Sequence, residues 1–238
     1  MSNSKNVEAF NRLIGICTGY GGTYSPGSPN LRVESLSELL SQARAVMHRV
    51  SIAKTGYETA TNEREVAFVE IRQLASRILV ELKSTGALPQ TVADAALMVR
   101  KIRGRVLAKK PAVTEVSEAM QVSRPRVTGS DFDSVVYHFE KLIETLIAEP
   151  RYVPGIGDLQ VATLQQKLHA LRKANEKVVT ATTGLGNARR DRNALLYFSP
   201  GSVKKTALAV KQQVKAIFGY SSEAAKAADR IKFTKYRS

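Results

Sequence analysis

The sequence predicts an all-α protein, an elongated helical bundle built from two tandem-duplicated helical units with a connecting helix. Three observations predict it. Apolar residues recur at alternating spacings of three and four, the period of one helix face. Sustained two-residue alternation rich in β-branched residues, the signal of a strand, is missing from the sequence. A long segment of the first half also recurs in the second half.

This recurrence appears when the chain is shifted by 128 residues, which aligns residues 31–66 with residues 159–194 without a gap. Eleven of these 36 positions are identical, whereas composition alone would give roughly two or three. Farther along, LASRILVELKSTGA and LAVKQQVKAIFGYS remain alike once an insertion around YFSPGS is allowed. We interpret the pattern as a tandem duplication of a structural unit of about 75 residues.

The first copy, residues 31–110, is expected to contain a long, a medium and a short helix. The long helix follows Pro29, which suits a helix start, and the medium helix spans residues 67–83 before Gly86. The short helix opens on a capping box at Thr91 and ends at Arg103. The apolar stripe of the long helix comprises Leu36, Leu39, Ala43, Val46, Val50, Ala53, Tyr57 and Ala60.

The second copy, residues 158–238, repeats this order. Its long helix is expected over residues 158–197, a length of roughly 60 Å at 1.5 Å per residue. A medium helix follows from Ser202 to Gly219, and a last one covers residues 222–233. Helices of this length cannot bury their apolar stripe alone, so each needs partner helices.

Two segments lie outside the copies. Residues 1–30 are predicted to be a flexible N-terminal segment because residues 17–30 are rich in glycine and serine. Residues 111–157 are predicted to be a linker with one acidic amphipathic helix at residues 131–148, capped by Ser130. Residues 131–150 contain five acidic residues and one lysine.

A resemblance accompanies this organisation. The segments LASRILVELKSTGA, TVADA and RKIRGR, together with ARRDRNALLY, TALAVKQQVKAIFGYSS and IKF, resemble an uncharacterised bacterial family of tandem-duplicated helical-bundle proteins. The resemblance covers most of residues 31–233. It implies a helical fold and carries no activity over to these residues.

Several function classes lack a sequence signal. The single cysteine, Cys17, rules out a disulfide framework, and His48, His138 and His169 stand in no metal-ligand motif. The glycines of residues 19–27 match neither a P-loop nor a dinucleotide fingerprint. We therefore expect no catalytic residues, no cofactor and no metal. No apolar run reaches the roughly 18–20 residues that span a bilayer, so we expect a cytoplasmic protein without a membrane span.

The charge of the chain is the strongest functional signal, because Lys and Arg outnumber Asp and Glu by 36 to 21. The excess lies in residues 100–110 and in the second copy, while residues 31–90 have a net charge of +1. Such a surface would attract a phosphate backbone, an acidic partner or an acidic lipid, or would only keep the protein in solution. The candidate polyanion-binding residues are Arg100, Lys101, Arg103, Arg105, Lys109, Lys110, Arg189, Arg190, Lys204, Lys205, Lys211, Lys215, Lys232, Lys235 and Arg237.

A second candidate set recurs in both copies. Glu63 and Arg64 of the first copy match Asp191 and Arg192 of the second, and the arginines fall on or beside the apolar stripe. We favour structural ion pairs that set helix register over a shared ligand site.

Two functions are compatible with these features. The first is a non-enzymatic structural or interaction protein, a helical scaffold that self-associates or docks a protein partner through its helices. The alternative is a sequence-independent nucleic-acid-binding protein that uses the basic clusters at residues 100–110 and 189–237.

Overall fold

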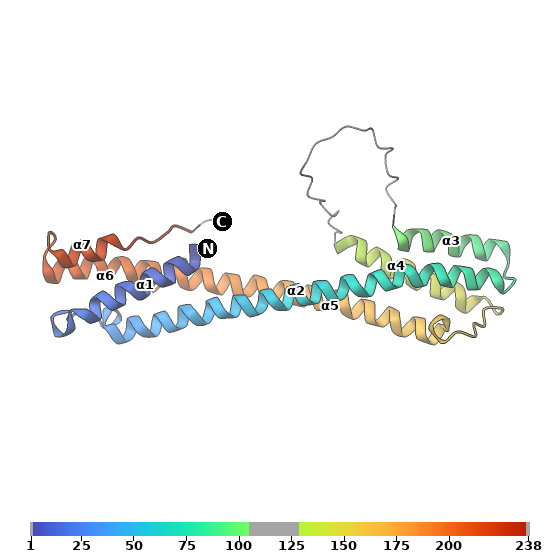
Figure 1. The fold of residues 1–238 in the computed structure, drawn as a ribbon, viewed down its shortest axis with the longest axis horizontal. Coiled ribbons are helices and arrows are strands. Elements are labelled where there is room, and N and C mark those ends of the chain that lie inside the picture. Colours follow the sequence, from blue (N-terminus) through green and yellow to red (C-terminus); the bar gives the residue numbers. More distant parts are fainter. Residues whose placement is uncertain (1, 105–128, 237–238) are drawn as a thin grey trace, which may run out of the picture. The chain divides into compact units, whose positions relative to one another are not determined.

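The computed structural model describes residues 2–104 and 129–236, and this part of the chain is helical without a β-strand (Figure 1). The predicted all-α helical bundle is confirmed. The α-helices are α1 (Ser2–Gly19), α2 (Val33–Ser84), α3 (Pro89–Arg103), α4 (Gly129–Ala148), α5 (Val161–Asn193), α6 (Val203–Phe218) and α7 (Glu223–Arg230). Short 3₁₀ turns are η1 (Gly21–Thr23), η2 (Pro29–Leu31) and η3 (Gly157–Leu159), and η4 (Ala194–Phe198) is a π-helical turn.

The chain forms two compact units, and each unit contains helices from both predicted copies. Unit 1 comprises residues 1–57 and 181–238, and unit 2 comprises residues 58–180. Helix α2 contributes its first part to unit 1 and its second part to unit 2, and α5 does the reverse. The units therefore do not follow the predicted boundaries of 31–110 and 158–238. The apolar face of one copy's long helix is covered partly by helices of the other copy.

Helix α1 corrects the prediction of a flexible segment over residues 1–30. It places Phe10, Leu13 and Cys17 in the core of unit 1, each fully buried. These residues are three or four positions apart, so they share one helix face. That face packs with α6 and α7, with the start of α2 and with η4. Tyr24 in the following loop is also buried, so the order of the N-terminal region extends beyond the helix.

Unit 2 has a separate core at the crossing of α2, α3, α4 and the start of α5. Helices α3 and α4 lie side by side (Figure 1). The Phe68 ring of α2 meets the Phe132 ring of α4 edge to face, with centroids 4.7 Å apart. The predicted acidic helix is confirmed as α4, and its apolar face buries Phe139 and Leu142 completely.

The two long helices end differently. Helix α2 continues without interruption from residue 33 to residue 84, so the predicted separate helix at residues 67–83 is its second half. No proline interrupts these 52 residues, and nothing forces a break. In the second copy the α-helix ends at Asn193, and η4 with the following SPGS turn redirects the chain into α6. The predicted helix over residues 158–197 is therefore shorter and ends in a π-helical turn.

The segment that precedes α2 and the segment that precedes α5 contain equivalent hydrogen bonds. The Tyr24 hydroxyl donates to the carbonyl oxygen of Leu31 at 2.9 Å, and the Tyr152 hydroxyl donates to that of Leu159, also at 2.9 Å. Both pairs are separated by the 128-residue shift found in the sequence, and so are η2 and η3. The duplication itself stays a prediction, and these matched contacts are what it would produce.

Alkaline unfolding is expected to depend on these two buried tyrosines. Burial raises the pKa of Tyr152 to about 12 and raises that of Tyr24. A folded-state pKa above the unfolded value of about 10 means that stability is complete below pH ~10 and falls as pH rises toward ~12. Tyr152→Phe should cost about 1 kcal/mol at neutral pH, through the lost hydrogen bond, and should flatten this alkaline decline. Urea unfolding across that pH range measures both effects, and an unchanged decline in the variant would contradict the assignment.

Candidate functional site

The net positive charge of the protein is concentrated in unit 1. Its residues include 18 Lys and Arg against six Asp and Glu, a net charge of +12, whereas unit 2 has 18 against 15, a net charge of +3. The sequence alone assigns the excess to residues 100–110 and to the second copy. In the structure, the basic end of the second copy packs in one unit with the first 57 residues, which are themselves basic. The charge excess therefore belongs to unit 1.

Unit 2 neutralises several of its cations by ion pairs between helices. Arg172 of α5 binds Glu140 of α4 at 2.7 Å, Lys177 binds Glu63 of α2, and Arg77 of α2 lies 3.7 Å from Asp158. Lys141 also pairs with Glu144 within α4. In unit 1, Lys215 pairs with Asp229 and Lys226 pairs with Glu223. Exposed arginines of unit 1 such as Arg49, Arg189 and Arg190 form no ion pair with a described residue.

Three lysines of the predicted C-terminal cluster are used inside unit 1. Lys205 donates to the Phe198 carbonyl at 3.0 Å, and Lys211 donates to the Ile231 carbonyl and lies 5.7 Å from the Phe233 ring centroid. The hydrogen bond between Lys215 and Asp229 raises the pKa of Lys215 and lowers that of Asp229. Lys211 and Lys215 thus hold α7 and the segment after it in place, and Lys205 binds the end of η4. All three are poor candidates for an external polyanion.

The other predicted cations divide between the units. Arg189, Arg190, Lys232 and Lys235 are exposed in unit 1, and Lys204 is half-buried there. Arg100, Lys101 and Arg103 are exposed in the last turn of α3, in unit 2. Arg105, Lys109, Lys110 and Arg237 lie outside the described residues.

Within each recurring pair, Glu63 with Arg64 and Asp191 with Arg192, the acid and the arginine form no ion pair with each other. Glu63 binds Lys177, while the Arg64 guanidinium stacks on the Phe132 ring, 3.9 Å from its centroid. Arg192 donates to the side-chain oxygen of the adjacent Asn193 at 2.7 Å. Asp191 forms no ion pair with a described residue and lines a groove. Arg64 and Arg192 thus pack against polar or aromatic neighbours.

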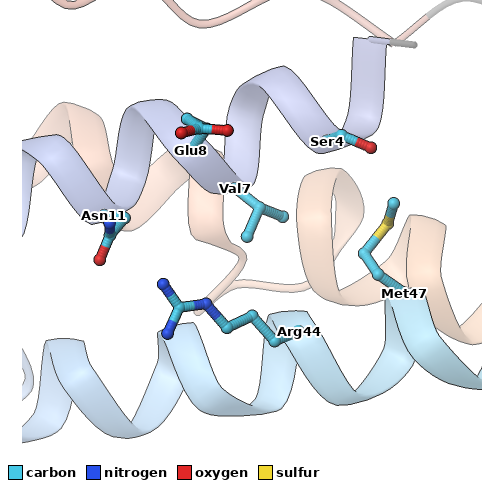
Figure 2. A pocket seen from close by; sticks show the side chains of 6 residues that line it. All are labelled: Ser4, Val7, Glu8, Asn11, Arg44 and Met47. Atoms are coloured by element: carbon cyan, nitrogen blue, oxygen red, sulfur yellow. The ribbon is translucent and has the colours of Figure 1, made fainter.

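Sequence reasoning missed two grooves of unit 1, each lined by an arginine of α2. The first lies between α1 and α2, has a volume of about 250 Å³, and is lined by Ser4, Val7, Glu8, Asn11, Arg44 and Met47. Figure 2 shows the Arg44 guanidinium extending from α2 toward α1, where Asn11 and Val7 face it. Arg44 forms no ion pair with a described carboxylate. The signal was hidden because residues 31–90 are nearly neutral as a whole.

The second groove lies between α2 and the end of α5 with η4. It has a volume of about 450 Å³ and is lined by Gln42, Ala45, Val46, Arg49, Asp191, Ala194, Leu195 and Ser199. Arg49 and Asp191 line it without forming an ion pair, and both are exposed. This groove presents both signs of charge, whereas Glu8 is the only charged neighbour of Arg44 in the first groove.

The residues of reactive or metal-binding type give no such arrangement. Burial raises the pKa of the Cys17 thiol to about 11, so the thiolate that reacts or binds metal is disfavoured. Burial also lowers the pKa of His138, and nearby Lys101 adds to this effect. Within residues 2–104 and 129–236, no group of three or more His, Cys, Asp or Glu side chains is placed to hold a metal ion.

Two further findings complete the description. No helix of the described residues is both long enough and apolar enough to cross a membrane. Comparison with known proteins finds no matching family model, no matching curated protein and no similar solved structure.

Proposed function

We propose that this protein is a non-enzymatic binding protein, a helical scaffold whose unit 1 binds nucleic acid through the phosphate backbone without reading its sequence. The observation that carries the proposal is the charge difference between the units, +12 against +3. In unit 2, interhelical ion pairs consume several cations. In unit 1, exposed arginines such as Arg49, Arg189 and Arg190 have no carboxylate partner among the described residues.

The physical reason for preferring a polyanion is the cost of concentrating like charges. Cations of one sign repel each other and oppose the compact state, unless counterions or a partner of opposite charge offset the repulsion. A phosphate backbone supplies that charge at close, regular spacing, and binding it releases condensed counterions. Arg49 lies in α2 and Arg189 and Arg190 lie in α5, so the backbone that carries them needs no ordering on binding.

Neutralising exposed cations of unit 1 should weaken duplex DNA binding about tenfold or more at moderate salt. The variant replaces Arg189, Arg190, Lys232 and Lys235 with glutamine. The slope of log affinity against log salt should flatten by about 0.9 for each lost phosphate contact. Fluorescence anisotropy with a labelled duplex, at several salt concentrations and with two unrelated sequences, measures affinity, slope and sequence independence.

A matched control replaces four ion-paired cations of unit 2, namely Arg77, Lys141, Arg172 and Lys177. It removes the same formal charge, and its salt slope should stay near that of the unaltered protein. Equal losses in both variants would show that net charge alone drives binding. Absence of binding to duplex or single strand at about 50 mM salt would refute the nucleic-acid proposal.

A second candidate function, docking of a protein partner or a second copy, is favoured by apolar side chains exposed in unit 2. Val80, Leu88 and Val153 are 69%, 60% and 80% exposed. Arg151 donates to the Gly86 carbonyl, so the loop that contains Val153 lies against the end of α2. Sedimentation of the same DNA-free sample distinguishes this candidate, because self-association would appear as a mass above 26.0 kDa.

A further inference from the structure

The groove between α1 and α2 has an equivalent position in unit 2, between α4 and α5, and polar contacts bridge the two helices there. In unit 2, Arg172 of α5 binds Glu140 of α4 at 2.7 Å. One turn away, the Asn175 amide donates to Asp133 of α4 at 2.8 Å. Helices α4 and α5 are thus joined by an ion pair and a hydrogen bond at the place where α1 and α2 leave an open groove.

The correspondence between these positions rests on buried residues. Phe10 and Leu13 of α1 match Phe139 and Leu142 of α4 at a shift of 129 residues, and all four are fully buried. Helices α2 and α5 match at a shift of 128, since each begins two residues after the equivalent 3₁₀ turn. Their difference is one residue, which the shorter loop after α4 accounts for.

At these shifts, the unit 1 residues that align with each contact pair of unit 2 cannot form the same contact. Arg44 stands at the position of Arg172, and Asn11 replaces its partner Glu140. Met47 replaces Asn175, and Ser4 replaces Asp133. The arginine is retained while both carboxylates are lost. The resulting groove contains a guanidinium that forms no ion pair with a described residue, and the neutral Asn11 lies near it.

We propose that this groove binds a single phosphate group, whose oxygens take the place that the Glu140 carboxylate has in unit 2. The guanidinium presents a planar set of N–H donors that suits two oxygens of one anion. The Asn11 amide on the opposite wall is a further donor. When two phosphate oxygens accept from the guanidinium, another oxygen remains for this donor, whereas both oxygens of a carboxylate are already engaged. Glu8 also lines the groove, and Figure 2 shows its carboxylate on α1, away from the Arg44 guanidinium.

The inference extends the proposed function, because a nucleic-acid backbone is one source of such a phosphate and a free phosphate is another. The volume of about 250 Å³ suits a phosphate with part of its sugar. Binding of inorganic phosphate tests the groove itself and does not depend on nucleic-acid binding.

The experiment titrates the full chain with inorganic phosphate near neutral pH and follows the Nε–Hε resonances of arginine by ¹H–¹⁵N NMR. Arg44 should shift saturably. Asn11→Glu restores the carboxylate present in unit 2 and should weaken phosphate binding about tenfold by occupying Arg44. Arg44→Gln should abolish binding, while Arg172→Gln, the matched change in unit 2, should leave it unaltered. Asn11 and Arg44 are exposed, so both changes should preserve the fold, which circular dichroism verifies.

Three outcomes would overturn the proposal. They are a resonance of Arg44 that does not saturate, an Asn11→Glu variant that keeps full affinity, and acetate binding as tightly as phosphate, which would make the groove a carboxylate site. Duplex DNA in a parallel titration separates the two sources of phosphate. If DNA binding needs the unit 1 cations while phosphate fails to bind, this inference alone fails. If phosphate binds and DNA does not, the proposed function fails and the groove stands.

Discussion

Replacing Phe139 with alanine is expected to lower the free energy of unfolding by about 3–5 kcal/mol. Phe139 of α4 is fully buried in the core of unit 2. Removing its ring deletes the transfer free energy of the ring and leaves a cavity that rigid helices fill only in part. Urea denaturation followed by circular dichroism measures the loss. Tyr137→Ala, on the same helix at a side chain 55% exposed, should cost less than about 1 kcal/mol.

The equivalent change in unit 1 tests whether the units are stabilised separately. Phe10 is also fully buried, but its core shares no residue with the core of Phe139. Native-state hydrogen exchange should therefore accelerate mainly within residues 58–180 for Phe139→Ala, and within residues 1–57 and 181–238 for Phe10→Ala. Equal acceleration in both units for either variant would show that they unfold as one, and would contradict this expectation.

The fold class and most helices could be predicted because amphipathic periodicity is a local property. The stripe that contains Leu164, Leu168 and Leu171 is buried as expected, and so is the face of α6 formed by Val203, Ala207 and Val210. Glycine also marked an end correctly: the φ angle of Gly219 after α6 is +88°, a conformation that favours glycine.

The grouping of helices could not be predicted in the same way. A stripe shows that a helix needs a partner, and it does not show which copy supplies that partner. Helix α1 illustrates a second difficulty. Its core positions Phe10, Leu13 and Cys17 have helical spacing. Residues 17–30 are rich in glycine and serine, a composition typical of loops, and this conceals the short helical pattern before them.

The candidate site depends on cross-helix contacts that a charge count does not contain. Lys215 was expected to face a polyanion, but Asp229 of α7 binds it. Arg44 belongs to a nearly neutral stretch, and its importance follows only from Asn11 of α1 standing where unit 2 has Glu140. The difference is present in the sequence, where Asn11 stands at the position that corresponds to Glu140, but it becomes visible only when α1 is aligned with α4.

The second large effect is expected at Asn6, which ties the C-terminal segment to α1. Its side chain is 2% exposed and is shared by several hydrogen bonds. The Asn6 amide donates to the Tyr197 hydroxyl and to the Thr234 carbonyl, each at 3.1 Å. In return, the Thr234 backbone N–H donates to the Asn6 side-chain oxygen at 2.8 Å. A buried asparagine that binds the backbone on both sides acts as a clamp across 228 residues of sequence.

Asn6→Ala should therefore cost about 2–4 kcal/mol, because the hydrogen bonds that join its buried side chain to Tyr197 and Thr234 are lost together. The effect should also be local, since the other polar anchors of the segment after α7 lie at its ends: Lys211 donates to the Ile231 carbonyl, and Asn193 donates to the Tyr236 hydroxyl at 3.3 Å. Trypsin should then cleave at Lys232 and Lys235 faster than in the unaltered protein. Asn11→Ala, at an exposed position on the same helix, should leave cleavage unchanged. If Asn6→Ala remained equally resistant, the packing of Phe233 against the unit 1 core, and not the asparagine clamp, would hold the C-terminal segment.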